Sequence, residues 1–276
     1  MNQNREAEQV KEEQKCLDLV RKNALSGFIL RDVDRVTPAE FDSCAIESII
    51  NPDLRTQVYG IDDVKLKRLL KALLFAEHNV KCNVFPDYIF EDWFVEIFRV
   101  SSTKEKKGTL YEQEQGRLRK EIQKSVDEKK SGCYVIDLNS DEFTRGNLKK
   151  SIREHLGHHL KSMDKYEGAW NQGCFVLEYR ENALTYDEER KDHYRIARDA
   201  EILNEIYQMT ASRNKELYIV FQSGTNVEMI LCQSIPRILE EIDSTENEQT
   251  IYGTGIIHIG LSENIGLVPL DNFEDI

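Results

Sequence analysis

Two acidic residues between Pro86 and Ser102 are of a type and spacing that could hold a divalent cation. Asp87 stands near the end of one strand-like run and Glu96 in the middle of the next. If the two runs form a hairpin, both carboxylates meet at one edge of a sheet. Two hard oxygen ligands suit Mg²⁺, which binds through one or two carboxylates and keeps waters for a phosphate substrate. The alternative is structural: Asp87 ends a strand, and Glu96 is an exposed residue of an amphipathic one.

The elements around this pair resemble those of a known superfamily of nucleases. A helical layer, a strand, an aspartate, a second strand bearing a glutamate and then a helix occur in the order of the restriction-endonuclease-like PD-(D/E)XK nucleases. The resemblance covers about residues 45–102, and the matching residues are Pro86, Asp87, Glu96 and Ile97. It implies Mg²⁺-dependent hydrolysis of DNA phosphodiesters, for example in restriction or defence, with Asp87 and Glu96 as metal ligands.

The chain departs from the superfamily pattern at one position. The lysine that the family has two residues after the glutamate, and that positions or activates the attacking water, is Phe98 here. Catalysis would then need a substitute from nearby, and Arg99, Lys104 and Lys106 are the candidates. Glu47, on the preceding helix, is a candidate for the further acid that some members carry there.

Charge is distributed unevenly along the chain. The formal net charge is −13, which by itself argues against a nucleic-acid partner. From Arg99 to Lys165, however, 16 Lys and Arg stand against 11 Asp and Glu. Such a stretch can attract phosphate, or it can be a set of solvated helix faces balanced by acid elsewhere. The residues that we expect to contact the backbone of a nucleic acid are Arg99, Lys106, Lys107, Arg117 and Arg119.

A second candidate site lies in the run GCFVLEYR. Glu178 and Arg180 occur there with Asp164 and Glu167 upstream, so an acid, a glutamate and a basic residue again follow in order. An E-x-R arrangement would keep the positive charge that Phe98 lacks. The alternative is that Glu178 is a salt-bridge partner at the end of a strand.

Histidines form a third cluster, in REHLGHHLK on a predicted helix. His155 and His159 share one face at i and i+4, which is the ligand spacing of a zinc-peptidase helix. Leu156 stands where the glutamate of that motif belongs. A solvated polar face, a histidine-based metallohydrolase and a general acid or base all fit this spacing.

An α/β fold, with a mixed β-sheet flanked by helices behind a helical N-terminal region, would position these residues. Residues 1–80 are predicted to be helical, with a solvent-facing helix or frayed arm first and later helices starting at Thr37 and at Asp62 or Asp63. Residues 81–276 form the mixed domain, in one continuous globular unit. Strands are expected within 82–90, 93–102, 133–138, 173–179, 216–222, 227–232 and 251–261, and long helices over 111–130, 145–163 and 186–209.

Composition indicates the kind of protein and its location. The six cysteines are scattered singly and are predicted to be buried free thiols. No stretch is long and apolar enough for a membrane span, and the polar N-terminus is unlike a signal peptide, so we expect a cytoplasmic protein without a membrane partner. The acidic surface, the long charged helices and the missing lysine also suit a non-catalytic regulatory subunit that binds a protein partner or forms a homodimer.

Overall fold

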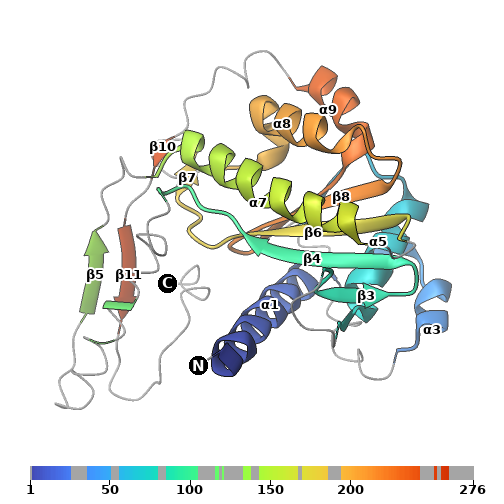
Figure 1. Ribbon diagram of the computed structural model, residues 1–276, viewed down its shortest axis with the longest axis horizontal. Coiled ribbons are helices and arrows are strands. Elements are labelled where there is room, and N and C mark those ends of the chain that lie inside the picture. Colours follow the sequence, from blue (N-terminus) through green and yellow to red (C-terminus); the bar gives the residue numbers. More distant parts are fainter. Residues whose placement is uncertain are drawn as a thin grey trace. The chain divides into compact units, whose positions relative to one another are not determined.

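The computed structural model (Figure 1) describes residues 2–25, 36–50, 56–79, 85–104, 116–117, 120, 133–137, 143–166, 170–185, 194–242, 252–253 and 256–260. They belong to two compact units that alternate along the sequence. The first unit comprises Met1–Val100, Ile152–Arg180 and Arg195–Glu248, and the second comprises Ser101–Ser151, Glu181–Tyr194 and Gln249–Ile276. The division therefore lies elsewhere than at residue 80, where the sequence suggested it.

The first unit is built on a seven-stranded mixed sheet with the strand order β1-β9-β8-β6-β4-β3-β2. β4, β6 and β8 run parallel to one another, whereas β3 and β9 are antiparallel to β4 and β8. The predicted mixed sheet is confirmed. Its strands are β1 (Thr56–Tyr59), β2 (Glu77–His78), β3 (Tyr88–Phe90), β4 (Trp93–Arg99), β6 (Gln172–Tyr179), β8 (Glu216–Ser223) and β9 (Asn226–Leu231).

Helices cover both faces of this sheet, as expected where parallel strands are joined by crossovers. α7 (Arg145–Lys165), which belongs to the first unit from Ile152 on, precedes β6, and α8 (Ala200–Thr210) precedes β8. Figure 1 shows α7, α8 and α9 (Ile235–Glu241) on one face and α1 (Asn2–Ala24) and α5 (Asp63–Phe75) on the other. Alternate residues of the central strands therefore meet different helices.

The N-terminal helix is part of the core. Leu17 and Val20 of α1 are fully buried in one apolar cluster with Leu69 of α5 and with Val95 and Val176 of the sheet. Burial of two such side chains stabilises the fold by about 1.5–3 kcal/mol each. The prediction of a solvent-facing helix or a frayed arm at the N-terminus is therefore wrong.

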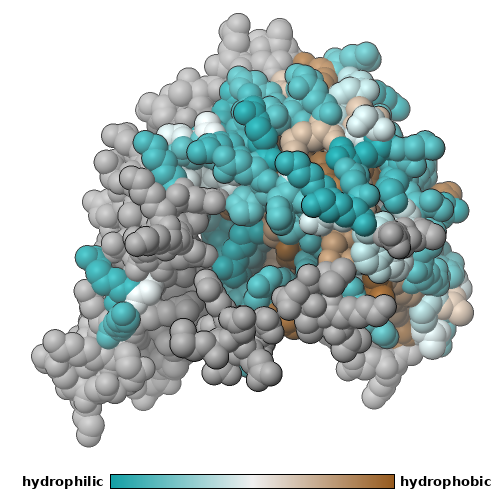
Figure 2. All heavy atoms as spheres, viewed as in Figure 1, coloured by the Kyte–Doolittle hydropathy of each residue, from teal (hydrophilic) through white to brown (hydrophobic). Residues whose placement is uncertain are grey.

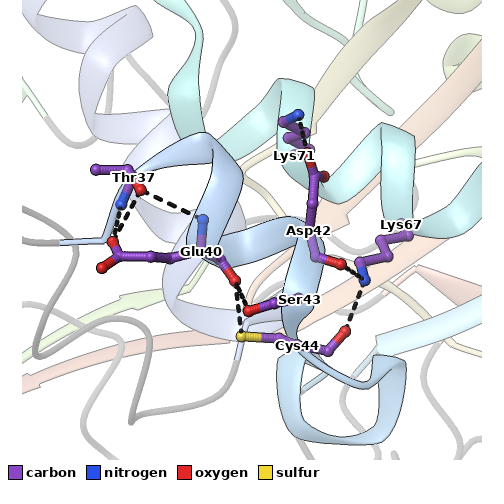
Figure 3. Close-up of polar contacts among 7 residues, drawn as sticks. All are labelled: Thr37, Glu40, Asp42, Ser43, Cys44, Lys67 and Lys71. Carbon is purple, nitrogen blue, oxygen red and sulfur yellow. Dashed lines mark hydrogen bonds and ion pairs between the residues drawn. The ribbon is translucent and has the colours of Figure 1, made fainter.

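Two predicted helix starts are confirmed. At α3 (Pro38–Ser43), the Thr37 hydroxyl accepts a hydrogen bond from the Glu40 N–H at 3.3 Å, and the Glu40 carboxylate accepts one from the Thr37 N–H at 2.7 Å. Figure 3 shows this reciprocal pair, a capping box. At α5, the Asp62 carboxylate accepts a hydrogen bond from the Lys65 N–H at 2.9 Å. Both helices thus satisfy N–H groups that have no partner inside the helix.

Lysines of α5 hold the end of α3 in place (Figure 3). The ammonium group of Lys67 donates to the carbonyl oxygens of Asp42 and Cys44, each at 2.6 Å. Lys71 forms an ion pair with the Asp42 carboxylate at 2.7 Å. The carbonyl groups at the carboxyl end of α3, which lack partners within the helix, are satisfied in this way.

The predicted hairpin that carries Asp87 and Glu96 is confirmed, whereas two strands and the start of one helix depart from the prediction. β1 and β2 lie within residues 1–80, which the sequence suggested to be helical. The helix expected over 186–209 begins only at Ala200, where the Asp199 carboxylate caps it by accepting the Ile202 N–H at 3.0 Å. Residues 186–193 and most of the helix predicted over 111–130 lie outside the described residues.

The second unit contains two small antiparallel pairs of strands. β5 (Cys133–Asp137) pairs with β11 (Ile256–Gly260), and β7 (Leu184–Thr185) pairs with β10 (Tyr252–Gly253). The strands predicted over 133–138 and 251–261 are therefore present, but they belong to these pairs and not to the seven-stranded sheet.

Where α7 lies, the face of the molecule seen in Figure 2 is mainly hydrophilic. Arg153 of α7 and Glu205 of α8 form an exposed ion pair, with both N···O distances 2.7 Å. Among the described residues, Val64 is the large apolar side chain that stands exposed. None of the helices in the described part is long and apolar enough to cross a membrane.

The cysteines that the structure describes with their side chains are free thiols. Those of Cys16, Cys174 and Cys232 are buried, and that of Cys44 is partly exposed.

Gly173 of β6 allows the Phe94 ring to lie directly over the sheet. A Cβ at Gly173 would stand 2.3 Å from Phe94 Cδ1, whereas a Cβ at Gly157 of α7 would stand 3.4 Å from the flexible end of Met209. We expect Gly173→Ala to lower the free energy of unfolding by about 1–3 kcal/mol through overpacking. The matched change Gly157→Ala, inside a helix, should raise it by about 0.5–1 kcal/mol. Urea unfolding of both variants measures this contrast, and equal effects would contradict it.

Glu228 of β9 is a buried acid that two backbone hydrogen bonds stabilise. Its carboxylate accepts the Ile196 N–H at 3.1 Å and the Ala197 N–H at 2.9 Å. Burial nevertheless raises the pKa of Glu228 to about 7, against these hydrogen bonds, which favour the ionised form. The folded protein therefore keeps a proton here that the unfolded chain releases at lower pH.

We expect Glu228→Gln to reduce the loss of stability between about pH 5 and about pH 8. Because the folded pKa lies above the unfolded one, the free energy of unfolding of the wild type falls as pH rises through this window. Glutamine keeps an acceptor but does not ionise, so the variant should lose less, by on the order of 2 kcal/mol. Urea unfolding at both pH values measures the difference, and parallel pH profiles would contradict the prediction.

Candidate functional site

Asp87 and Glu96 lie opposite each other across the β3–β4 hairpin, as the sequence suggested. The Glu96 carboxylate accepts the Asp87 N–H at 2.9 Å, and the Asp87 carboxylate accepts the Ile97 N–H at 2.8 Å. Each acid is thus fixed by the backbone of the segment that carries the other. Glu96 is buried, so the alternative of an exposed residue on an amphipathic strand is wrong.

Asn79, at the end of β2, holds the segment that carries Asp87. The Asn79 N–H donates to the Asp87 carbonyl oxygen at 2.7 Å, and its side-chain amide donates to the Pro86 carbonyl oxygen at 2.9 Å. Asn79 is itself buried. Asn79, which follows β2, and Ile97 of β4 therefore jointly fix the position of Asp87.

α7 adds a histidine to the pair. His159 Nδ1 lies 2.5 Å from the Oε1 atom of Glu96, whose other oxygen binds the Asp87 N–H. The His159 ring stacks on Phe98, with the ring centroids 4.5 Å apart and the planes 9° apart. His155, one helical turn earlier, stacks on the same phenyl ring at 6.3 Å. Phe98, at the position of the nuclease lysine, therefore supports the imidazole that contacts Glu96.

Burial sets the protonation of this cluster. It raises the pKa of Asp87, to which the negative charge of Glu96 adds, and it raises the pKa of Glu96 despite the hydrogen bond from Asp87. Burial, aided by the charge of His155, lowers the pKa of His159 to about 4. The short contact between Glu96 and His159 is therefore between groups that both favour their uncharged form. Near neutral pH, the two carboxyl groups retain at least one proton between them.

The negative charge of Glu13, on α1, also acts on this cluster. The negative charge of Glu13 raises the pKa of Asp87, Glu96 and His159 alike, and burial raises the pKa of Glu13 itself. Among the described residues, Glu13 of α1 is thus a further acid whose charge acts on the pair. Glu47, which we expected in this role, lies on α4 (Ile46–Ile49) with an exposed side chain.

The remaining predicted residues are distributed differently. Lys104 and Arg117 are exposed and belong to the second unit. Lys106, Lys107 and Arg119 lie outside the described residues. Of the residues expected to contact nucleic acid, Arg99 is the one that the first unit contains.

The second candidate site is an ion-pair cluster at the carboxyl ends of β4 and β6. The buried carboxylate of Glu178 binds Arg180 Nε at 2.7 Å and Arg99 Nε at 3.0 Å. Glu12 of α1 binds both guanidinium groups, at 2.6 Å from Arg180 Nη2 and 2.8 Å from Arg99 Nη2. Glu178 is therefore a salt-bridge partner at the end of β6, which is the structural alternative, and Arg99 from the first candidate segment joins its pair with Arg180.

Asp164 does not belong to this cluster. Its carboxylate forms an ion pair with Arg213 at 2.6 Å, near the end of α7. Residues 172–177 of β6 separate that end from Glu178, and six residues of extended strand span about 20 Å. The grouping of Asp164 with Glu178 and Arg180 is corrected accordingly.

The cluster of Asp87, Glu96 and His159 offers two carboxylates to a hard divalent cation and no further ligand of that type. Asp87 and Glu96 supply two carboxylates, which is the number that Mg²⁺ uses alongside waters and substrate oxygens. Within the described part of the chain, no group of three or more His, Cys, Asp or Glu is arranged to hold a metal ion. Any cation bound here would thus rest on the two carboxylates and on ligands from outside the protein.

Three residues of these clusters were not expected from the sequence: Glu12, Glu13 and Asn79. The one signal for the two glutamates is their place on α1, shortly before the apolar residues that bury the helix. His159 was expected on a shared helix face with His155, but its contact with Glu96 spans 63 residues. Local spacing carries no information about such contacts.

The geometry thus defines a buried dicarboxylate–histidine site beside an arginine–glutamate cluster, on the two sides of β4. Comparisons of the chain with protein-family models, with curated proteins and with solved structures find no match.

We expect Asp87→Asn to stabilise the protein at high pH. The raised pKa values mean that the wild type loses stability as pH rises from the ordinary carboxyl range through the folded pKa. Asparagine keeps an acceptor for the Ile97 N–H and removes the like charge beside Glu96. The gain in free energy of unfolding should be about 1–2 kcal/mol near pH 9 and smaller near pH 5.

Thermal unfolding at the two pH values tests this prediction. Asp92→Asn, in the exposed turn of the same hairpin, is the matched control and should show no such gain. A variant that is less stable than the wild type at high pH would show that the two carboxylates do not repel each other.

Proposed function

We propose that the first unit carries a Mg²⁺-dependent nuclease site that hydrolyses phosphodiesters, with Asp87 and Glu96 as the metal ligands. The observation that carries this proposal is the reciprocal anchoring of two buried carboxylates, each by the backbone next to the other. When acids held together in this way ionise, their mutual repulsion and the negative charge of Glu13 destabilise the folded protein. A bound divalent cation neutralises these charges and removes the destabilisation.

The order of elements supports the same proposal. α5, β3 with Asp87 just before it, β4 with Glu96 and then α7 follow one another along the chain. The resemblance to the PD-(D/E)XK nucleases rests on a similar order, with two differences: Asp87 was expected near the end of a strand but precedes β3, and β5 lies between β4 and α7. Asp87, just before β3, also lies opposite Glu96 of β4, which brings the two carboxyl groups close together, as two ligands of one ion require.

The residues have distinct roles in the proposed site. Asp87 and Glu96 hold the cation and give up their retained proton as they do so, so that apparent metal affinity rises with pH. Bound Mg²⁺ supplies charge neutralisation and polarisation of a phosphoryl oxygen. Burial lowers the pKa of His159 to about 4, but once metal binding ionises Glu96, the negative charge beside Nδ1 favours the protonated imidazole, and His159 can then accept a proton from the attacking water. It would thus take the part of the lysine that Phe98 replaces.

Nucleic acid, with DNA first, is the proposed substrate, and a cytoplasmic location is part of the proposal. The excess of Lys and Arg between residues 99 and 165 supports this choice, since neutralising phosphates drives such binding. Within that stretch, Arg99 stands at the end of the strand that carries Glu96.

We expect Glu96→Gln to abolish binding of Mg²⁺ and Mn²⁺ and to lower DNA cleavage by roughly 100-fold or more, because one of two ligands is lost. Isothermal calorimetry with each metal measures the binding, and cleavage of linear and single-stranded DNA and of RNA in the same buffers measures activity. His159→Asn should keep metal binding and lower the rate of cleavage by about 10²-fold or more.

The control is Asp92→Asn, which removes an acid from the exposed turn of the same hairpin and should leave both readouts unchanged. Circular dichroism and thermal unfolding establish that each variant is folded. A folded wild type that neither binds metal nor cleaves any of the substrates would overturn the proposal.

A non-catalytic regulatory or interaction protein is the second candidate, and Phe98 favours it. The phenyl ring fills the position of the family lysine, and both oxygens of Glu96 are already engaged, one by His159 and one by the Asp87 N–H. Such a protein would fold and bind its partner equally well with Glu96 replaced by Gln. The metal and cleavage measurements therefore separate the two candidates.

A further inference from the structure

Two arginines converge on a single oxygen atom at the carboxyl ends of two adjacent parallel strands. Arg99 ends β4, and Arg180 follows β6 directly. Their Nη2 atoms lie 2.8 Å and 2.6 Å from the same atom, Oε2 of Glu12. The carboxyl ends of parallel strands are where open α/β sheets bind their ligands.

The buried carboxylate of Glu178 fixes this convergence. It binds the Nε atoms of Arg180 and Arg99 through one oxygen each, at 2.7 Å and 3.0 Å. Glu178 is 4% exposed, so its own position is set by packing. Both guanidinium groups are therefore held from behind, and their Nη2 atoms lie close to one point, where an anionic oxygen can pair with both.

The Glu12 carboxylate, which lies between the two guanidinium groups, can move away from them. Glu12 is 40% exposed on α1, whereas Leu17 and Val20 anchor the helix in the core. The Glu12 carboxylate can thus rotate into solvent without unpacking α1. Loss of Glu12 from this point would leave two guanidinium groups facing the same space, which is an arrangement suited to a phosphate group.

We propose that Arg99 and Arg180 form a phosphate-binding clamp for the phosphodiester backbone of DNA, and that the Glu12 carboxylate occupies this clamp as an internal competitor. Arg99 and Glu96 stand on the same strand with side chains toward opposite faces, three residues apart. The identity of the ligand rests on the proposed nuclease function, whereas the clamp itself rests on the geometry of the four charged groups.

The experiment measures binding of a short fluorescein-labelled DNA duplex by fluorescence anisotropy in EDTA, so that neither metal nor cleavage contributes. Glu12→Gln should tighten binding by about tenfold, because the clamp is no longer held in its occupied form. Asp18→Asn, which removes an equal charge from the same helix away from the clamp, is the matched control and should change affinity much less. The double variants Glu12→Gln with Arg99→Gln or with Arg180→Gln should lose the gain.

Two further readouts identify the ligand. The salt dependence of binding by Glu12→Gln should be steeper than that of either double variant, by a slope of about one. Excess inorganic pyrophosphate should displace the duplex from Glu12→Gln. Pyrophosphate binding without any gain in duplex affinity would overturn the assignment to nucleic acid.

Equal tightening by Glu12→Gln and Asp18→Asn, or none by either, would overturn the clamp. Thermal unfolding confirms that the variants are folded, and a merely structural ion-pair cluster would show lower stability in Glu12→Gln without a gain in affinity. If the clamp binds DNA but the wild type shows no metal-dependent cleavage, the nuclease proposal fails alone. If cleavage is observed and the gain in affinity is absent, the clamp fails alone.

Discussion

The pairing of β4 with its two neighbours is the constraint on which both polar clusters depend. Because alternate side chains of a strand point to opposite faces, Glu96 meets α7 and Arg99 meets α1. The antiparallel partner β3 brings Asp87 against Glu96, and the parallel partner β6 brings Glu178 against Arg99. A shift of β4 by one residue would send Glu96 to α1 and Arg99 to α7, so that neither cluster could form.

Three glutamates buried in the same sheet are stabilised in three different ways. Glu178 is matched by two guanidinium groups, and Glu228 by two backbone N–H groups. Glu96 receives one backbone N–H and an uncharged imidazole, and it stands beside a second acid, Asp87. The electrostatic cost of ionisation is thus largest at the Asp87–Glu96 pair. Groups whose pKa is displaced in this way gather at functional sites.

Local signals predicted the parts of this structure that depend on neighbouring residues. Turn residues and apolar runs predicted the hairpin that joins Asp87 to Glu96, and capping residues predicted the starts of α3 and α5. The short strands β1 and β2 were missed, because four and two residues are too few for a period. Contacts between distant elements, such as that of Glu96 with His159, are decided by tertiary packing, which no local spacing encodes.

The edge strand β1 also has a consequence for how the chain folds. Thr56 is paired in parallel with Val227, so the strand follows the first helices in sequence but finds its partner only after most of the chain has been synthesised. Pairing over such a separation raises the contact order and slows folding. During translation, the backbone of β1 therefore stays unpaired while β3 and β4 can already form their hairpin, and completion of the sheet is a late event.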